Sequence, residues 1–261
     1  MTANVPAVSA AVRILERLAA ERPRPVSPGT LVSELGLNRS TCYNILATLQ
    51  ASGWAASTGR AGWTLGPRLL ALTGVSQELV AGVVQDELDA LSRKLGFVAF
   101  AAEFDGTAAF TVVAKAERAN GIRVSVGVGD RFPFAAPALL QAFTAWLPES
   151  EVRALVRRNG LTAYTRHTVT EPAEFDRVLG AVRADGFSRS VRQLDLSQGA
   201  AGATVFDSRS RPLFAVVVLG FSSELDEARV DEVGPVVRAC ADRITLRIGG
   251  TPPAGYPTTG D

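Results

Sequence analysis

The feature that most constrains this chain is a pair of short helical patterns joined by a glycine turn, within residues 27–52. Ser27-Pro28 marks the start of the first pattern, because serine caps a helix N-terminus and proline is tolerated in its first turn. Gly36 ends that pattern, and Gly-Leu-Asn leads into a second helix expected over residues 39–52. Two helices joined in this way predict a helix-turn-helix.

The second predicted helix has two chemically different faces. An apolar stripe at i, i+3, i+4 and i+7 predicts the side that packs on a core: Cys42, Ile45, Leu46 and Leu49. The opposite side carries small and polar groups with one aromatic: Ser40, Tyr43, Asn44 and Ala47. A winged helix that contacts proteins would favour exposed apolar residues there, so this face favours DNA as the partner. A ligand-sensing or scaffold protein that uses the fold for protein contacts stays the alternative.

A helix and a hairpin flank this pair. Apolar residues recurring at Val8, Val12, Leu15 and Leu18–Ala19 predict an amphipathic helix over residues 9–21. Strand patterns over residues 53–56 and 62–65 predict a hairpin, the wing, with Arg60 near its tip. Residues 1–75 hold seven arginines against three glutamates, a balance of +4, whereas the rest of the chain balances to −3. A basic end on an acidic body is expected of a module that contacts phosphates.

Composition argues against several other classes of protein. A hydrophobic content of 47% with 20% charged residues is typical of a globular chain. No apolar run approaches the ~20 residues of a membrane helix, and the N-terminus lacks the features of a secretory signal, so we expect a cytoplasmic protein. Cys42 and Cys240 lie far apart, and the single histidine, His167, has no partner at a metal-ligand spacing. The sequence therefore predicts no metal, no cofactor and no enzymatic activity.

The residues beyond 66 predict a mixed α+β arrangement. Apolar residues from Leu69 to Val80 predict a linker helix over residues 67–82, and a further helix is expected over residues 83–95. Strands are then expected over 97–104, 107–115, 122–126, 203–207 and 213–219, and helices over 137–146, 149–158, 172–184 and 224–248. Residues 250–261 are rich in proline and glycine and predict a disordered tail.

Three N-terminal segments resemble the IclR family of bacterial regulators in order and spacing: SAAVRILERLA, LVSELGLNRSTCYNILATLQASGW and WTLGPRLLAL. VGDRFPF, LQAFTAWLP, VRADGF and AGATVFDSRSRPLFAVVVLG extend the resemblance over essentially the whole chain. It implies a DNA-binding transcriptional regulator, expected to be a repressor, with a winged helix-turn-helix over residues 1–66. It also implies a GAF-like effector-binding domain over residues 83–249 that encloses a small-molecule pocket, and a linker helix that contributes to a homodimer or homotetramer.

By this resemblance the helix over residues 39–52 enters the major groove of a double-stranded DNA operator. Ser40 and Thr41 match the family's hydroxyl pair, which suits phosphate contacts at a helix N-terminus, and Arg39 stands where a basic residue is usual. Tyr43 and Asn44 replace a common His-Arg pair, and asparagine fits the adenine edge whereas arginine fits guanine. These five residues and Arg60 form the predicted DNA-binding set.

The resemblance also locates a pocket, where this chain departs from relatives that bind small carboxylates. Those relatives read roughly P-L-H-A-T-A-L-G-K-A, whereas residues 133–142 here read PFAAPALLQA, without the histidine, threonine and lysine. Farther on, an arginine and a cysteine become Gly199 and Ala200. Matching positions to the family predicts these lining residues: Ala135, Ala138, Leu139, Ser190, Ala200, Val217 and Leu219.

Six of these seven side chains have no hydrogen-bonding group, and burying a carboxylate without donors costs several kcal/mol. The sequence therefore predicts a pocket that rejects small organic acids. Two alternatives stay open. The pocket holds an apolar or aromatic effector through area burial, at roughly 25 cal/mol per Å², or the substituted side chains fill it and there is no effector.

Overall fold

The computed structural model describes residues 5–21, 24–117 and 124–257, and the side chains of these residues other than Arg60 and residues 70–78. It divides into two compact units, Met1–Leu79 and Val80–Asp261, each with its own hydrophobic core. The division falls within one continuous helix, α4 (Arg68–Leu95). The sequence predicted two helices here, over residues 67–82 and 83–95. That prediction is wrong, because a single helix continues from Arg68 to Leu95. The domain boundaries at residues 66 and 83 stay a prediction.

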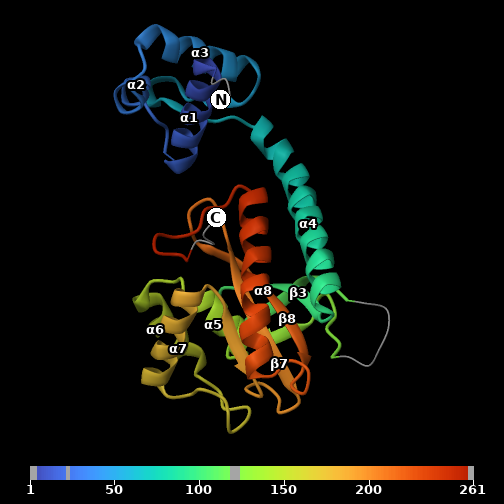
Figure 1. Cartoon of the computed structure of the whole chain (residues 1–261). Coiled ribbons are helices and arrows are strands. Elements are labelled where there is room, and N and C mark those ends of the chain that lie inside the picture. Colours follow the sequence, from blue (N-terminus) through green and yellow to red (C-terminus); the bar gives the residue numbers. More distant parts are fainter. Residues whose placement is uncertain (1–4, 22–23, 118–123, 258–261) are drawn as a thin grey trace. The chain divides into compact units, whose positions relative to one another are not determined.

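Ahead of α4, the described part of the N-terminal unit contains three helices and a two-stranded hairpin (Figure 1): α1 (Pro6–Ala20), α2 (Pro28–Leu35), α3 (Arg39–Ala51), β1 (Ala55–Ser57), the 3₁₀ turn η1 (Gly59–Ala61) and β2 (Trp63–Leu65). The hydroxyl of Ser27 accepts the N–H of Thr30 at 3.1 Å and caps α2. Gly36 follows α2 with a φ of 63°, which glycine adopts without steric cost. The local signals for α2, for the turn and for α3 are thus confirmed.

The face of α1 that enters the core matches the predicted apolar residues only in part, because Leu18 is among them and Val8 and Val12 are not on that face. Ala10, Ile14 and Leu18 are buried, whereas Val8 and Val12 are 60% and 47% exposed. Apolar residues occur all round this helix, so they form more than one stripe at helical spacing. The packing of α1 on α2 and α3, which is not local, selects the stripe that is buried.

The C-terminal unit is built on a six-stranded antiparallel sheet in the order β5-β4-β3-β8-β7-β6. Its strands are β3 (Val98–Phe104), β4 (Ala109–Ala116), β5 (Arg131–Pro133), β6 (Ser188–Val191), β7 (Gln198–Phe206) and β8 (Pro212–Phe221). One face packs on α5 (Pro137–Thr144), α6 (Glu149–Asn159) and α7 (Pro172–Asp185). The other face packs on the end of α4 and on α8 (Glu227–Arg247), as Figure 1 shows. The predicted mixed α+β fold is therefore present.

Strand alternation assigns side chains to these two faces. Phe100 and Val217 belong to the core under α5, whereas Ala101 and Val218 belong to the core under α8. The short strands β5 and β6 were not predicted. The strand predicted over residues 122–126 is absent from residues 124–126, and its other two residues lie outside the described chain. Among the described helices, none combines the length and hydropathy needed to cross a membrane.

The tail predicted to be disordered is instead packed on the domain as far as residue 257. Tyr256 is 8% exposed, and its ring lies 4.8 Å from that of Trp146 and 5.3 Å from that of Phe206, centroid to centroid. Its hydroxyl donates to a carboxylate oxygen of Asp242 at 2.8 Å. The prolines and glycines that indicated disorder here flank an aromatic anchor. Residues 258–261 lie outside the described chain.

Candidate functional site

The N-terminus of α3 is closed by a side-chain cap. Oδ1 of Asn38 accepts the N–H of Thr41 at 2.8 Å and the hydroxyl of Ser40 at 3.1 Å. The N–H groups of Arg39 and Ser40 lie in the first turn, where a helix offers them no acceptor. Two free N–H groups at the positive end of the helix dipole suit a phosphate oxygen.

The predicted base-reading side chains lie together on the outer face of α3. Arg39, Ser40, Tyr43 and Asn44 are exposed, and Thr41 is half-buried. The guanidinium carbon of Arg39 lies 5.9 Å from the ring centroid of Tyr43, so the two side chains lie against each other. The side-chain amide of Asn44 makes no hydrogen bond to any described residue, which leaves its donor and acceptor free. The apolar face below holds Cys42 and Leu46, both fully buried.

Two of the seven arginines that make the N-terminal net charge positive are bonded to other groups within the N-terminal unit. Arg13 donates to the carbonyl oxygen of Leu35 at 2.9 Å, and Arg17 bridges Glu21 and Glu34. The guanidinium of Arg17 is hydrogen-bonded to the Glu34 carboxyl and lowers the pKa of that carboxyl below its ordinary value. The local charge count therefore overstates what is available to DNA, because it does not show which cations are already paired.

The wing is the hairpin of β1 and β2, with Ala56 opposite Thr64 in the register. A bridge between Val26 and Trp63 ties this hairpin to the segment before α2. Arg60 belongs to η1 at the tip of the hairpin, and its side chain lies outside the described part of the chain. Its role at the backbone of DNA stays a prediction.

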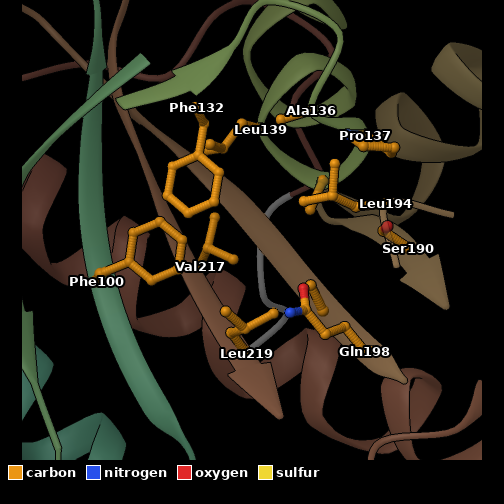
Figure 2. Close-up of a pocket in the computed structure, with 13 residues that line it drawn as sticks. Phe100, Phe132, Ala136, Pro137, Leu139, Ser190, Leu194, Gln198, Val217 and Leu219 are labelled. Carbon is orange, nitrogen blue, oxygen red and sulfur yellow. The ribbon is translucent and has the colours of Figure 1, made fainter. Parts of the chain in front are cut away.

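A cavity in the C-terminal unit brings together six of the seven predicted pocket residues (Figure 2). Ala138, Leu139, Ser190, Ala200, Val217 and Leu219 all line it. Ala135 does not; it lines a separate cavity of about 10 Å³, together with Gln141 and Gln193. The remaining lining residues were missed by position matching: Phe100, Phe132, Ala136, Pro137, Leu194, Gln198 and Gly199.

The cavity has one aromatic side and one polar edge. The rings of Phe100 and Phe132 stack with centroids 5.6 Å apart and planes inclined by 11°. Figure 2 shows Ser190 and Gln198 away from these rings, and they contribute a hydroxyl and a neutral amide. Among the described lining residues there is no arginine, lysine, histidine or carboxylate. Strand alternation could have identified Phe100, whereas nothing local indicated Gln198.

Position matching implied that replacing the family's arginine by Gly199 removes a hydrogen-bond donor from the cavity. The structure contradicts this for residue 199. A Cβ added there would lie 1.9 Å from the carbonyl oxygen of Leu225, which packs in the core on the α8 side of the sheet. A side chain at residue 199 therefore points away from the cavity, whereas Ala200 belongs to the core on the cavity side. The substitution that changes the cavity here is the one at residue 200.

The cavity is small as it stands, with a volume of about 30 Å³. That is room for about one water molecule, whereas an apolar cavity of roughly 150 Å³ holds benzene. The lining side chains therefore nearly fill the space in this conformation.

Among the described residues, no three histidine, cysteine, aspartate or glutamate side chains gather as a metal site would require. Both cysteines are buried and unpaired, and burial raises the pKa of the Cys240 thiol to about 12. That thiol stays protonated at neutral pH and is a poor nucleophile.

Comparisons with known proteins agree with both parts of this description. Family models match over residues 7–59, as the IclR helix-turn-helix domain, and over residues 73–246, as the bacterial transcriptional regulator IclR C-terminal domain. The transcriptional repressor IclR of Escherichia coli is 27% identical over 253 residues, which are 95% of this chain and 92% of that protein. The glycerol operon regulatory protein of Streptomyces coelicolor is 27% identical over 256 residues, 95% and 98% of the two chains. A solved IclR transcriptional regulator from Alicyclobacillus acidocaldarius is 25% identical with a TM-score of 0.62, covering 95% of this chain and 100% of that one.

Proposed function

Because the chain belongs to the IclR family, and is therefore a DNA-binding transcriptional regulator and not an enzyme, we propose that it is a repressor that inserts α3 into the major groove of an operator. The observation that carries this proposal is the outer face of α3, where Arg39, Tyr43 and Asn44 are exposed above a capped N-terminus. DNA binding requires the compartment of the chromosome, so we place the protein in the cytoplasm.

Base reading is proposed for Asn44, whose free amide matches the donor and acceptor of adenine in the major groove. Footprinting of the purified protein on the DNA flanking its own gene identifies the operator. Titration of that operator with Asn44→Ala should then show a loss of about 1–3 kcal/mol in binding and a relaxed preference at one base pair. Ser33→Ala, an exposed hydroxyl of α2, is the matched control and should bind as the wild type does. Unchanged affinity and selectivity in Asn44→Ala would remove Asn44 from the proposed readout.

Self-association is proposed because one winged helix buries too small an interface for tight, selective binding. The run of apolar residues from Leu69 to Val80 in the sequence predicts a surface for a second copy. We expect at least a dimer, with an inverted-repeat operator as the consequence of two-fold symmetry. Light scattering with and without DNA measures the mass, and a monomer of 27.5 kDa at micromolar concentration would contradict this proposal.

For the cavity between β3, α5 and β7, we propose a neutral aromatic or apolar effector that carries one hydrogen-bonding group. Support comes from the stacked rings of Phe100 and Phe132 and from the uncharged polar groups of Ser190 and Gln198. A cavity of about 30 Å³ must open to admit such a molecule. Phe132 is the side chain we expect to move, because it is half-exposed and belongs to the three-residue edge strand β5.

Thermal-shift measurements separate this proposal from a cavity that is simply filled. Acetophenone, a neutral aromatic ketone, should stabilise the protein saturably, whereas pyruvate and glyoxylate should not. Phe132→Ala enlarges the cavity and should strengthen binding of the ketone, while Val128→Ala, a change at a residue that is 61% exposed, should not. Stabilisation by glyoxylate or pyruvate at sub-millimolar concentration would contradict the proposed chemistry. No stabilisation by the ketone, even in Phe132→Ala, would favour the filled cavity. An effector alters operator binding only by its different affinities for the DNA-competent and incompetent states.

A further inference from the structure

A second cavity lies farther along the same face of the sheet. Phe104 lines it, four residues after Phe100 on β3, which is about 13 Å along a strand. Helix α5 borders both cavities, with Leu139 at the first and Phe143 near its C-terminal end at the second. The second cavity has a volume of about 420 Å³, which falls within the 300–1,000 Å³ range of small-molecule pockets. It needs no rearrangement to hold a ligand.

The floor of this cavity is aromatic and its side wall is one face of a helix. The rings of Phe104 and Phe143 lie 5.4 Å apart, centroid to centroid, in a tilted arrangement. The side wall is α6, which contributes residues at i, i+3, i+4 and i+7: Glu151, Ala154, Leu155 and Arg158. This spacing places the four side chains along one face of the helix.

The walls are held in place by polar contacts at both ends of α6. Near its N-terminus, the carboxylate of Glu151 accepts hydrogen bonds from both terminal nitrogens of Arg211, at 2.9 and 2.7 Å. At its C-terminus, the amide of Asn159 donates to the carbonyl oxygen of Thr107, in the β3–β4 turn, at 3.0 Å. A cavity with such walls is preformed, so a ligand would not have to order them.

The charges around the cavity favour an anion. The guanidinium of Arg211 pairs with the Glu151 carboxyl and lowers the pKa of that carboxyl. The two groups are therefore both charged at neutral pH, and the pair has no net charge. Arg158 also lines the cavity, and its guanidinium has no ion pair or hydrogen bond with any described residue. Basic residues in the last turn of a helix do compensate its dipole. That explanation applies equally to Arg157, which does not line the cavity. It does not explain why Arg158 lies beside a cavity that Phe104 and Phe143 also line.

We propose that this cavity is a second ligand site, which takes a small monocarboxylate with an aromatic or alkyl body. The apolar body rests on Phe104 and Phe143, and the carboxylate pairs with Arg158, whose planar fork of donors matches carboxylate geometry. The first cavity has no cation among its described lining residues, so charge separates the ligand classes of the two sites. This site does not depend on how the protein reads DNA.

Calorimetric titration of the full-length protein with 3-phenylpropionate tests the proposal, with the neutral 3-phenylpropan-1-ol as the comparison. The carboxylate should bind saturably and at least tenfold more tightly than the alcohol. Arg158→Gln should weaken the carboxylate at least tenfold. Arg157→Gln, which removes the same charge from the adjacent exposed residue outside the cavity, should change its affinity less than twofold.

A blocking variant distinguishes this site from the first cavity. Ala154 is exposed on α6, so Ala154→Phe fills the second cavity without disturbing a core, and it should abolish binding of 3-phenylpropionate. Circular dichroism on each variant verifies folding. The proposal is overturned by no saturable binding, by equal losses in Arg157→Gln and Arg158→Gln, or by binding that survives Ala154→Phe. Because these titrations contain no DNA, their failure leaves the proposed operator binding untouched.

Discussion

The packed segment around Tyr256 leads to a quantitative prediction, because its composition predicts disorder whereas its aromatic side chain is buried. Tyr256→Ala removes a ring that is 8% exposed and contacts the rings of Trp146 and Phe206. Truncating a large buried aromatic residue to alanine costs about 3–5 kcal/mol, from lost burial and the cavity left behind. We expect the lower half of that range, because the neighbouring Gly255 is exposed and Pro257 is only half-buried, so this segment can shift into the space more readily than a core strand.

Tyr256→Phe isolates the hydroxyl, which donates to Asp242 at 2.8 Å. Removing a hydrogen bond to a partly buried carboxylate costs about 1–3 kcal/mol. Burial is the main cause that raises the pKa of Asp242 above its ordinary value of 3.8, and the bond from Tyr256 opposes that rise. A raised folded-state pKa contributes stability that is full below pH 3.8 and is lost as the pH rises through the folded value. Loss of the hydroxyl raises the folded pKa further, so Tyr256→Phe should cost more at pH 7 than at pH 4.

Differential scanning calorimetry of the full chain measures these changes, since the transition of the C-terminal unit should move while that of the N-terminal unit stays. Leu246→Ala is a suitable control, because that side chain is 78% exposed and should change stability by no more than about 0.5 kcal/mol. If Tyr256→Ala costs less than about 1 kcal/mol, the tail is not anchored and the disorder expected from its composition is correct after all.

Three further substitutions have expected outcomes. Arg60→Ala should weaken binding to all DNA sequences alike and flatten the salt dependence, measured by anisotropy between 50 and 200 mM salt; a loss confined to one operator sequence would assign Arg60 to base reading instead. Asn38→Ala removes the cap of α3 and should cost about 1 kcal/mol in the unfolding of the N-terminal unit, and a value near zero would show that water replaces the cap. Gly199→Ala places a Cβ against the carbonyl oxygen of Leu225 and should destabilise the C-terminal unit by about 1–3 kcal/mol in urea unfolding, whereas a neutral result would mean that the loop at Leu225 moves aside.

The sequence by itself determined the local structure of the helix-turn-helix, α2, the turn at Gly36 and α3. The cap at Ser27, the left-handed Gly36 and the stripe through Cys42 and Leu46 are each specified by residues within one or two helical turns. Hydrogen bonds and spacings at that range do not depend on the rest of the fold, so α2, the turn and α3 were predictable. The resemblance to a family added the pocket, and six of its seven matched positions do line one cavity.

Tertiary structure alone decided the features that rest on contacts distant in sequence. Packing selected which stripe of α1 is buried, and Arg17 was removed from the cations available to DNA by pairing with Glu34, seventeen residues away. Tyr256 became an anchor because it meets Trp146, and the direction of residue 199 follows from its strand register. A linear pattern records the kind of side chain at each position but not its partner, and in these four cases the partner determines the outcome.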